Sequence, residues 1–179
     1  MAGFTDRLLR AAKLDVTVYE EVEADKEAIS QAMGVVVLSS VAAGIGTGLA
    51  AGFVSIIAGV IVSLLAWYVW AYLTYIIGTK VLPEPRTHAD IGQLLRSTGF
   101  SSSPGLIRIV GVFPGLTDLA FLVAGIWMLI AMVVAVRQAL DYTSTLRAVG
   151  VCLIGWVVQS IILAVFLALA SPPRSGIVL

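Results

Sequence analysis

Residues 53–78 read FVSIIAGVIVSLLAWYVWAYLTYIIG and contain no charged side chain. A helix needs about 20 apolar residues to cross the roughly 30 Å hydrocarbon layer of a bilayer. This stretch exceeds that length, and a spanning helix tolerates its scattered hydroxyl groups. The sequence therefore predicts a membrane-spanning helix here, and a helical membrane protein around it.

The composition of the whole chain indicates the same class. Of the 179 residues, 59% are hydrophobic and 12% are charged, and the mean hydropathy is +1.01. A soluble domain has about a quarter of its residues charged. Eleven basic and eleven acidic residues cancel, so no net field favours nucleic acid as a partner. The first 32 residues are mostly polar, so we expect no cleavable signal peptide.

Four further apolar runs accompany the first. The five predicted spans are residues 33–51, 53–78, 99–116, 119–136 and 148–170. We therefore expect an all-α fold: an integral membrane bundle of five transmembrane helices with an amphipathic cytoplasmic N-terminal helix. The domain organisation is an N-terminal segment (1–32), the five-helix domain (33–171) and a short extracytoplasmic tail (172–179).

The distribution of basic residues predicts the orientation. Nine of them fall in the N-terminal segment and in the second-to-third and fourth-to-fifth connections, whereas the other side has only Arg174. Lysine and arginine accumulate on the cytoplasmic side of membrane proteins. We therefore expect a cytoplasmic N-terminus and an extracytoplasmic C-terminus.

The N-terminal segment has two parts of opposite character. Residues 1–13, MAGFTDRLLRAAK, have the pattern of an amphipathic helix that lies on an anionic leaflet. Residues 15–27 are acidic, with Lys26 as the one basic exception. Thr17 and Glu20 fit a capping box, which predicts a helix start. The acidic part can lean on the cytoplasmic arginines, bind a basic partner or remain solvated.

The third predicted span is interrupted. It contains Pro104, which removes a backbone hydrogen bond, and Arg108, which is costly at membrane depth and is a functional candidate by default. Candidate partners of the guanidinium are the Tyr68 hydroxyl, Gln159, Ser160 and free carbonyls near Pro104. These residues form either a structural polar cluster or a site for an anion or a lipid headgroup.

Small residues in the first span form a stripe at four-residue spacing. The stripe consists of Ser40, Gly44, Gly48 and Gly52, and such stripes let helices approach closely. The turn to the second span is short, which favours packing within the chain; a homodimer face is the alternative. The aromatic residues of the second span favour helix packing and an interfacial belt, with a groove for a lipid or quinone-like ligand as the alternative.

Catalytic and metal-binding patterns do not occur in the sequence. His88 is the only histidine and Cys152 the only cysteine, so no transition-metal set can form from them. The predicted spans contain no pair of carboxylates, and there is no phosphate-binding or dinucleotide-binding glycine motif. We expect no enzymatic activity, no metal and no cofactor.

Two stretches resemble a known family. These are PEPRTHADIGQLLRSTGFSSSPGL (83–106) and VRQALDYTSTLRAVGVCLIGW (136–156), and with the five spans they resemble bacterial members of the Yip domain family, the Ypt/Rab-GTPase-interacting five-pass membrane proteins. The resemblance implies a helical membrane bundle with a cytoplasmic N-terminus, in a bacterial plasma membrane. Eukaryotic members bind prenylated GTPases in vesicle traffic. The short N-terminal tail of this chain argues against a GTPase partner.

These observations favour a non-enzymatic membrane scaffold or adaptor that binds lipid and another membrane protein. An accessory subunit of a larger complex is a special case, and a small transporter or channel that uses the interrupted span and Arg108 is the alternative. We expect the partner to bind the cytoplasmic face. The residues predicted for that face are Glu20, Glu21, Glu23, Arg86, Arg96, Arg137 and Arg147.

Overall fold

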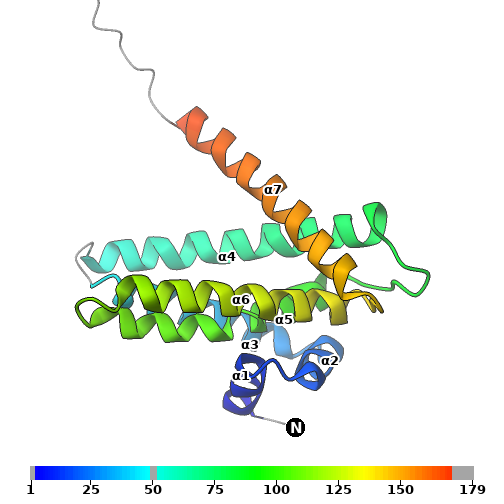
Figure 1. The fold of residues 1–179 in the computed structure, drawn as a ribbon, viewed down its shortest axis with the longest axis horizontal. Helices are drawn as coiled ribbons and strands as arrows, with labels where there is room; N and C mark the ends of the chain where they lie inside the picture. The colour runs from blue at the N-terminus through cyan, green and yellow to red at the C-terminus, as the bar shows by residue number, and fades with distance from the viewer. Residues whose placement is uncertain (1–2, 49–51, 171–179) are drawn as a thin grey trace, which may run out of the picture.

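The computed structural model describes residues 3–48 and 52–170, and every regular element in those ranges is helical (Figure 1). The α-helices are α1 (Phe4–Ala12), α2 (Val16–Ala24), α3 (Ala28–Gly46), α4 (Gly52–Ile76), α5 (Ile91–Phe100), α6 (Thr117–Ala139) and α7 (Thr145–Ala170). A π-helical turn, η1 (Ile77–Val81), extends α4, and a 3-10 helix, η2 (Ser103–Val112), follows α5. The predicted all-α class is confirmed; the predicted tail 172–179, with Arg174, lies outside the described residues.

Within the described ranges, four helices are long and apolar enough to cross a membrane. They are α3, α4 with η1, α6 and the part of α7 up to Val165. These helices correspond to four of the five predicted spans. The remaining one, residues 99–116, is not a single α-helix, because α5 ends at Phe100 and η2 continues in a tighter 3-10 form.

The interruption between α5 and η2 has a local cause. Asp90 starts α5 with a complete capping box, in which its carboxylate accepts from the Gln93 amide at 2.8 Å and the Gln93 side chain accepts from the Asp90 amide at 2.6 Å. After Phe100 comes a run of serines, and Pro104 stands in the first turn of η2. The Ser103 hydroxyl donates to the Phe100 carbonyl at 2.6 Å, which satisfies a backbone group at the break.

The helices are arranged as a bundle with one divergent member. In Figure 1, α3, α4, α6 and the α5–η2 segment run along the same direction, whereas α7 leaves the bundle at a steep angle. Helix α7 contacts α4, α6 and η1 near its beginning. The short helices α1 and α2 pack on the side of the bundle, where α2 contacts α5 and α6.

The closest approach in the bundle joins α3 to η2. A Cβ on Gly46 would come within 2.0 Å of the Arg108 carbonyl oxygen, and a Cβ on Gly105 within 2.1 Å of the Ser39 Oγ atom. At Gly46 only glycine fits, because the backbones of α3 and η2 meet there, whereas Gly105 lies against the Ser39 side chain. The expected stripe is only partly used for packing: Gly44 faces Ile56 of α4, while Gly48 has a φ of +86°.

Candidate functional site

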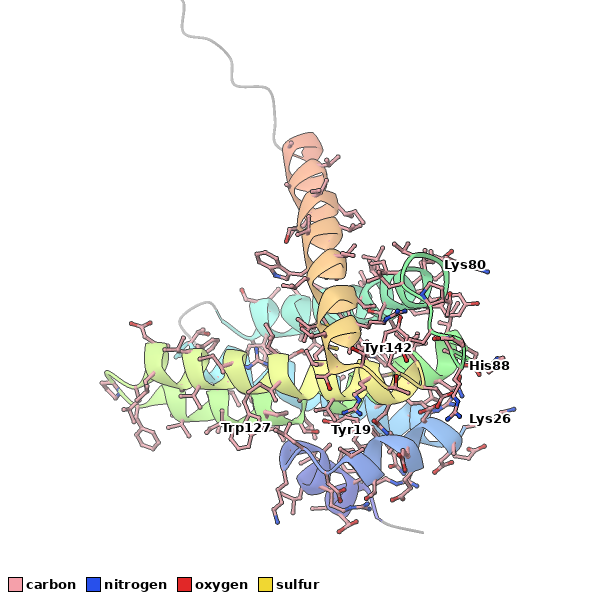
Figure 2. All side chains as sticks on the ribbon, turned by 45° about the vertical axis from the view of Figure 1, so that its right-hand side comes forward. Tyr19, Lys26, Lys80, His88, Trp127 and Tyr142 are labelled. Atoms are coloured by element: carbon pink, nitrogen blue, oxygen red, sulfur yellow. The ribbon has the colours of Figure 1, made fainter. Side chains whose placement is uncertain are left out.

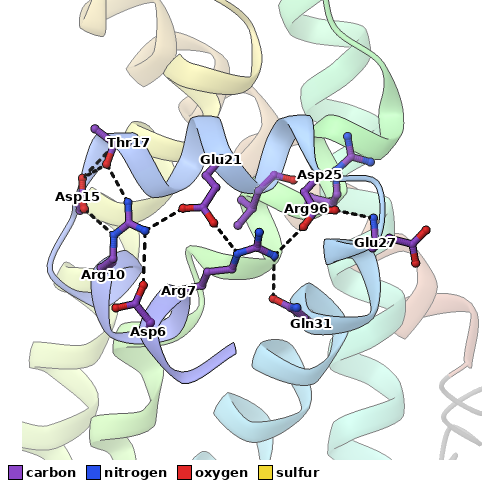
Figure 3. Close-up of polar contacts among 11 residues, drawn as sticks. Asp6, Arg7, Arg10, Asp15, Thr17, Glu21, Asp25, Glu27, Gln31 and Arg96 are labelled. Carbon is purple, nitrogen blue, oxygen red and sulfur yellow. Dashed lines mark hydrogen bonds and ion pairs between the residues drawn. The ribbon is translucent and has the colours of Figure 1, made fainter. Parts of the chain in front are cut away.

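Helices α1 and α2, which we call the polar layer, are held together by ion pairs (Figure 3). Arg7 has a side chain that is only 4% exposed, and its guanidinium contacts Glu21 at 2.9 Å and Asp25 at 2.8 Å. Its Nη1 atom also donates to Gln31 at the start of α3, at 3.1 Å. Arg7 therefore connects the first three helices through one buried guanidinium.

A second arginine of α1 completes this network. Arg10 contacts Asp15 at 2.9 Å and Glu21 at 2.8 Å, and it donates to the Thr17 hydroxyl. Hydrogen bonds from Arg10 are the main reason that the pKa values of Asp15 and Glu21 are lowered. The acidic helix α2 thus pairs with the basic residues of α1. The sequence analysis had instead expected α1 to lie on a membrane surface.

The apolar side of α1 faces protein. Ala11 is fully buried in a core cluster with residues of α2, α3, α5 and α6, and Phe4 and Leu8 pack against that cluster. The Tyr19 hydroxyl donates to the Ala11 carbonyl at 3.1 Å inside it. Burial of the phenol raises the pKa of Tyr19. The structure therefore fixes α1 and α2 on the bundle by apolar contact as well as by charge.

Arg96 of α5 holds the C-terminal end of α2. It is 6% exposed, and its Nε atom donates to the Val22 carbonyl at 2.9 Å, while Nη2 donates to the Glu23 carbonyl. A cation near the last carbonyls of a helix is favoured by the helix dipole and by the free acceptors there. Arg96 therefore has a buried docking role and is not available to a partner in this conformation.

Glu23 is the one acidic residue of α2 whose pKa is raised, to about 7. Burial is the largest cause, followed by the charges of Asp141, Glu20 and Asp90, while Arg96 opposes the shift. Like charges and a low dielectric both disfavour the ionised carboxylate. Glu23 thus changes charge close to neutral pH within the polar layer.

The α6–α7 turn is fixed to the α4–α5 loop. Glu84 accepts from the Thr143 amide at 2.9 Å and lies 3.6 Å from Arg147, whose Nη1 atom donates to the Pro83 carbonyl at 2.7 Å. Arg137 donates to the Tyr142 carbonyl at 3.3 Å. The hydrogen bonds at Thr143 are the main reason that the pKa of Glu84 is lowered. The sequence analysis did not identify Glu84, because its partners come from a distant turn.

The residues predicted for the partner face therefore differ in availability. Glu20 accepts from Gln138 at 2.8 Å, and five others, Glu21, Glu23, Arg96, Arg137 and Arg147, take part in the contacts just described. Arg86 is exposed and forms no ion pair within the described residues. Lys26 and Lys80 are also exposed, and Figure 2 shows both beside His88 at one end of the molecule. We call Lys26, Lys80 and Arg86 the basic rim.

Arg108 connects η2 to α3. Its Nη2 atom donates to the Ser39 Oγ atom at 2.5 Å and to the Ser39 carbonyl at 3.2 Å, and its Nε atom donates to the Gly105 carbonyl at 3.0 Å. The guanidinium lies 5.9 Å from the centre of the Phe121 ring, a cation–π distance. Of the partners considered from sequence, a carbonyl near Pro104 is used, and Ser39 is a partner that was missed.

Two adjoining cavities contain Arg108. One, of about 250 Å³, is also lined by Ser39, Ser63, Ser102 and Gln159; the other, of about 250 Å³, extends toward Thr47. The buried Gln159 Oε1 atom has no hydrogen-bond partner. The structure thus brings Gln159 to the cavity of Arg108. Tyr68 is 55% exposed and Ser160 is exposed, and neither lines these cavities.

Aromatic residues of α4 also contribute to this region. The Trp67 indole donates to the Leu95 carbonyl at 3.2 Å, and the Trp70 indole donates to the Met132 sulfur at 3.1 Å. Tyr72 is 46% exposed, like Tyr68 on the same side of the helix. The two indoles therefore pack α4 against α5 and α6, and the tyrosines project outward.

Comparisons with family models, with curated proteins and with solved structures find no match to the chain. The resemblance to the Yip domain family therefore remains an expectation from the sequence. Among the described residues, no group of three His, Cys, Asp or Glu side chains could hold a metal ion.

Proposed function

We propose that the protein is a non-enzymatic scaffold or adaptor of a bacterial plasma membrane, which binds lipid and another membrane protein. One observation carries the proposal. At the end of the bundle formed by α2 and the α4–α5 loop, acidic side chains are paired within the chain, whereas basic side chains are exposed. Glu21 of α2 and the two aspartates that flank this helix, Asp15 and Asp25, are paired with Arg7 and Arg10 of α1, whereas the basic rim is exposed.

The basic rim defines the chemistry of the proposed contact. Exposed lysine and arginine on one face attract an acidic surface and steer its approach. The rim also fits the orientation predicted from the sequence, since the cytoplasmic side of membrane proteins is rich in these residues. We therefore propose an acidic segment of a neighbouring membrane protein as the partner, with five passes of this chain through the membrane and the rim in the cytoplasm.

Site-specific photo-crosslinking in the native membrane tests this proposal. A photoreactive residue placed next to Arg86 is expected to give one protein adduct of defined mass. Reversing the charge at Lys26, Lys80 and Arg86 together should abolish the adduct. The matched control is Lys13→Glu, since Lys13 is an exposed lysine outside the rim. Adducts with lipid alone, or an adduct unaffected by the triple reversal, would contradict the adaptor function.

A small transporter or channel is the second candidate. The observation in its favour is the break between α5 and η2 beside the cavities of Arg108, because interrupted helices often line substrate sites in transporters. Solute flux in proteoliposomes that disappears in Arg108→Ala would favour this function. Absence of flux across a panel of inorganic and organic anions would exclude the transport of those solutes.

A further inference from the structure

The Arg108 side chain is partly buried, and its positive charge has no counter-ion among the residues that the structure describes. No carboxylate among the described residues lies within ion-pair distance of it, and its hydrogen bonds go to Ser39 and Gly105 through Nε and Nη2. The two N–H groups of Nη1 donate to no described residue. A charge held in a medium of low dielectric is costly unless an opposite charge accompanies it. No described residue supplies such an opposite charge.

Gln159 of α7 offers a second group to the same cavity. Its Oε1 atom is buried and accepts no hydrogen bond. A side-chain amide can turn by 180°, which would place its NH2 group at this position instead. In that orientation Gln159 becomes a donor beside the guanidinium, in a cavity also lined by Ser63 and Ser102. With the Nη1 group of Arg108 and the serine hydroxyls, several hydrogen-bond donors then line one small space.

The space around Arg108 continues into an apolar groove. A groove of about 470 Å³ runs between α4, α6 and α7, and it shares Trp70, Met128 and Met132 with the cavity of Arg108. Trp156 of α7 lines its far wall. The groove exists because α7 diverges from α6 (Figure 1). A cavity with a charged end and an apolar end matches an amphiphilic ligand, which has a polar head and an apolar chain.

The position of the charged end agrees with the orientation of a lipid. The backbone of Arg108 lies against Gly46, the last residue of α3, at the end of that helix opposite α1 and α2. The second cavity of Arg108 opens toward Thr47, just beyond α3. The guanidinium itself reaches back to Ser39, inside α3, so a head bound there enters from the Thr47 end of the bundle and its chain runs along the bundle toward the polar layer.

We propose that this site binds an anionic phospholipid, with its phosphate at Arg108 and Gln159 and one acyl chain in the groove lined by Trp70 and Trp156. The site has one positive charge and no negative one among its described lining residues. It therefore favours a head with a net negative charge over a zwitterionic head, whose ammonium group would meet the guanidinium. The inference rests on the proposed membrane location and is independent of the protein partner.

Native mass spectrometry from nanodiscs tests the site. The full-length protein is placed in phosphatidylcholine nanodiscs that contain a minor share of phosphatidylglycerol, and the lipid retained after release in neutral detergent is identified. We expect one phosphatidylglycerol per chain, enriched at least about tenfold over its share of the nanodisc. Arg108→Gln should remove this enrichment, and Trp156→Ala should reduce it severalfold.

Gln159→Leu separates ligand binding from folding. Arg108 also holds η2 on α3, so a loss in Arg108→Gln can follow from misfolding, whereas Gln159 has no protein hydrogen bond at Oε1 to lose. We expect Gln159→Leu to keep the thermal stability and to lose enrichment severalfold, and Ser160→Ala, an exposed neighbour, to change neither.

Three results would overturn the proposal. They are equal retention of the two lipids, full enrichment in Gln159→Leu and Trp156→Ala, and displacement of the lipid by millimolar inorganic phosphate. The last result would mean that the site recognises a free oxyanion. Charge reversal of the basic rim should leave lipid retention unchanged, so failure here is distinguishable from failure of the adaptor function.

Discussion

Replacing Arg7 by methionine tests whether ion pairing holds the polar layer on the bundle. Methionine keeps the apolar stem and removes the guanidinium that lies 2.9 Å from Glu21. Breaking a fully buried ion pair costs roughly 3–5 kcal/mol, and an exposed one is worth about 1 kcal/mol or less. The Arg7 side chain is 4% exposed and that of Glu21 is 31% exposed, so the value for this pair lies between these limits, at about 2 kcal/mol.

Native-state hydrogen exchange gives the most direct measurement of this loss. A change of about 2 kcal/mol corresponds to roughly 30-fold faster exchange of the amides that open together. We expect this acceleration in α1 and α2, with unchanged rates in α6. Lys13→Met is the control, because Lys13 is exposed and forms no ion pair within the described residues. Unchanged exchange in Arg7→Met would refute the reasoning and assign the docking to apolar contacts alone.

Two further predictions concern the polar layer and the bundle. Burial raises the pKa of Glu23 from 4.5 to about 7, so its contribution to stability is present below about pH 4.5 and is lost as the pH rises through 7. The protection of the α2 amides, measured relative to their intrinsic exchange rates at each pH, should therefore fall between about pH 5 and 8 by about 1 kcal/mol after solvent screening. Glu23→Gln should remove this loss of protection. Gly46→Ala would place a Cβ 2.0 Å from a carbonyl oxygen and should cost about 3 kcal/mol or more in thermal unfolding, whereas Gly59→Ala, in open space on α4, should be neutral or slightly stabilising.

The long apolar runs could be predicted because their signal is local. The run at 53–78 corresponds to α4 at Gly52–Ile76, and the run at 119–136 corresponds to α6 at Thr117–Ala139. The third predicted span is not one α-helix, because Pro104 and the serines before it change the backbone hydrogen-bond pattern. Hydropathy alone does not distinguish an α-helix from a 3-10 helix.

The partners of charged residues could not be predicted, because they depend on which helices meet. The sequence shows a change of charge sign between α1 and α2, yet the pairing of Arg7 with Glu21 requires the turn between them. Likewise, Arg108 was identified from the sequence as a cation at membrane depth, but its partner Ser39 lies 69 residues away and no local pattern marks it. Gly46 also has no distinctive spacing, and its importance comes from the backbone of η2.

The ion-paired α1–α2 unit has a consequence for the order of assembly during synthesis. Its internal pairs join residues only 11 and 14 positions apart, so it can form as soon as it leaves the ribosome. Its attachment requires Arg96, 73 residues after Glu23, and Gln138, 118 residues after Glu20. At roughly 5–20 residues per second, the finished unit waits several seconds or more for α5 and α6. Docking of α1 and α2 is therefore a late step of assembly, because it can occur only after α5 and α6 have been synthesised and have packed.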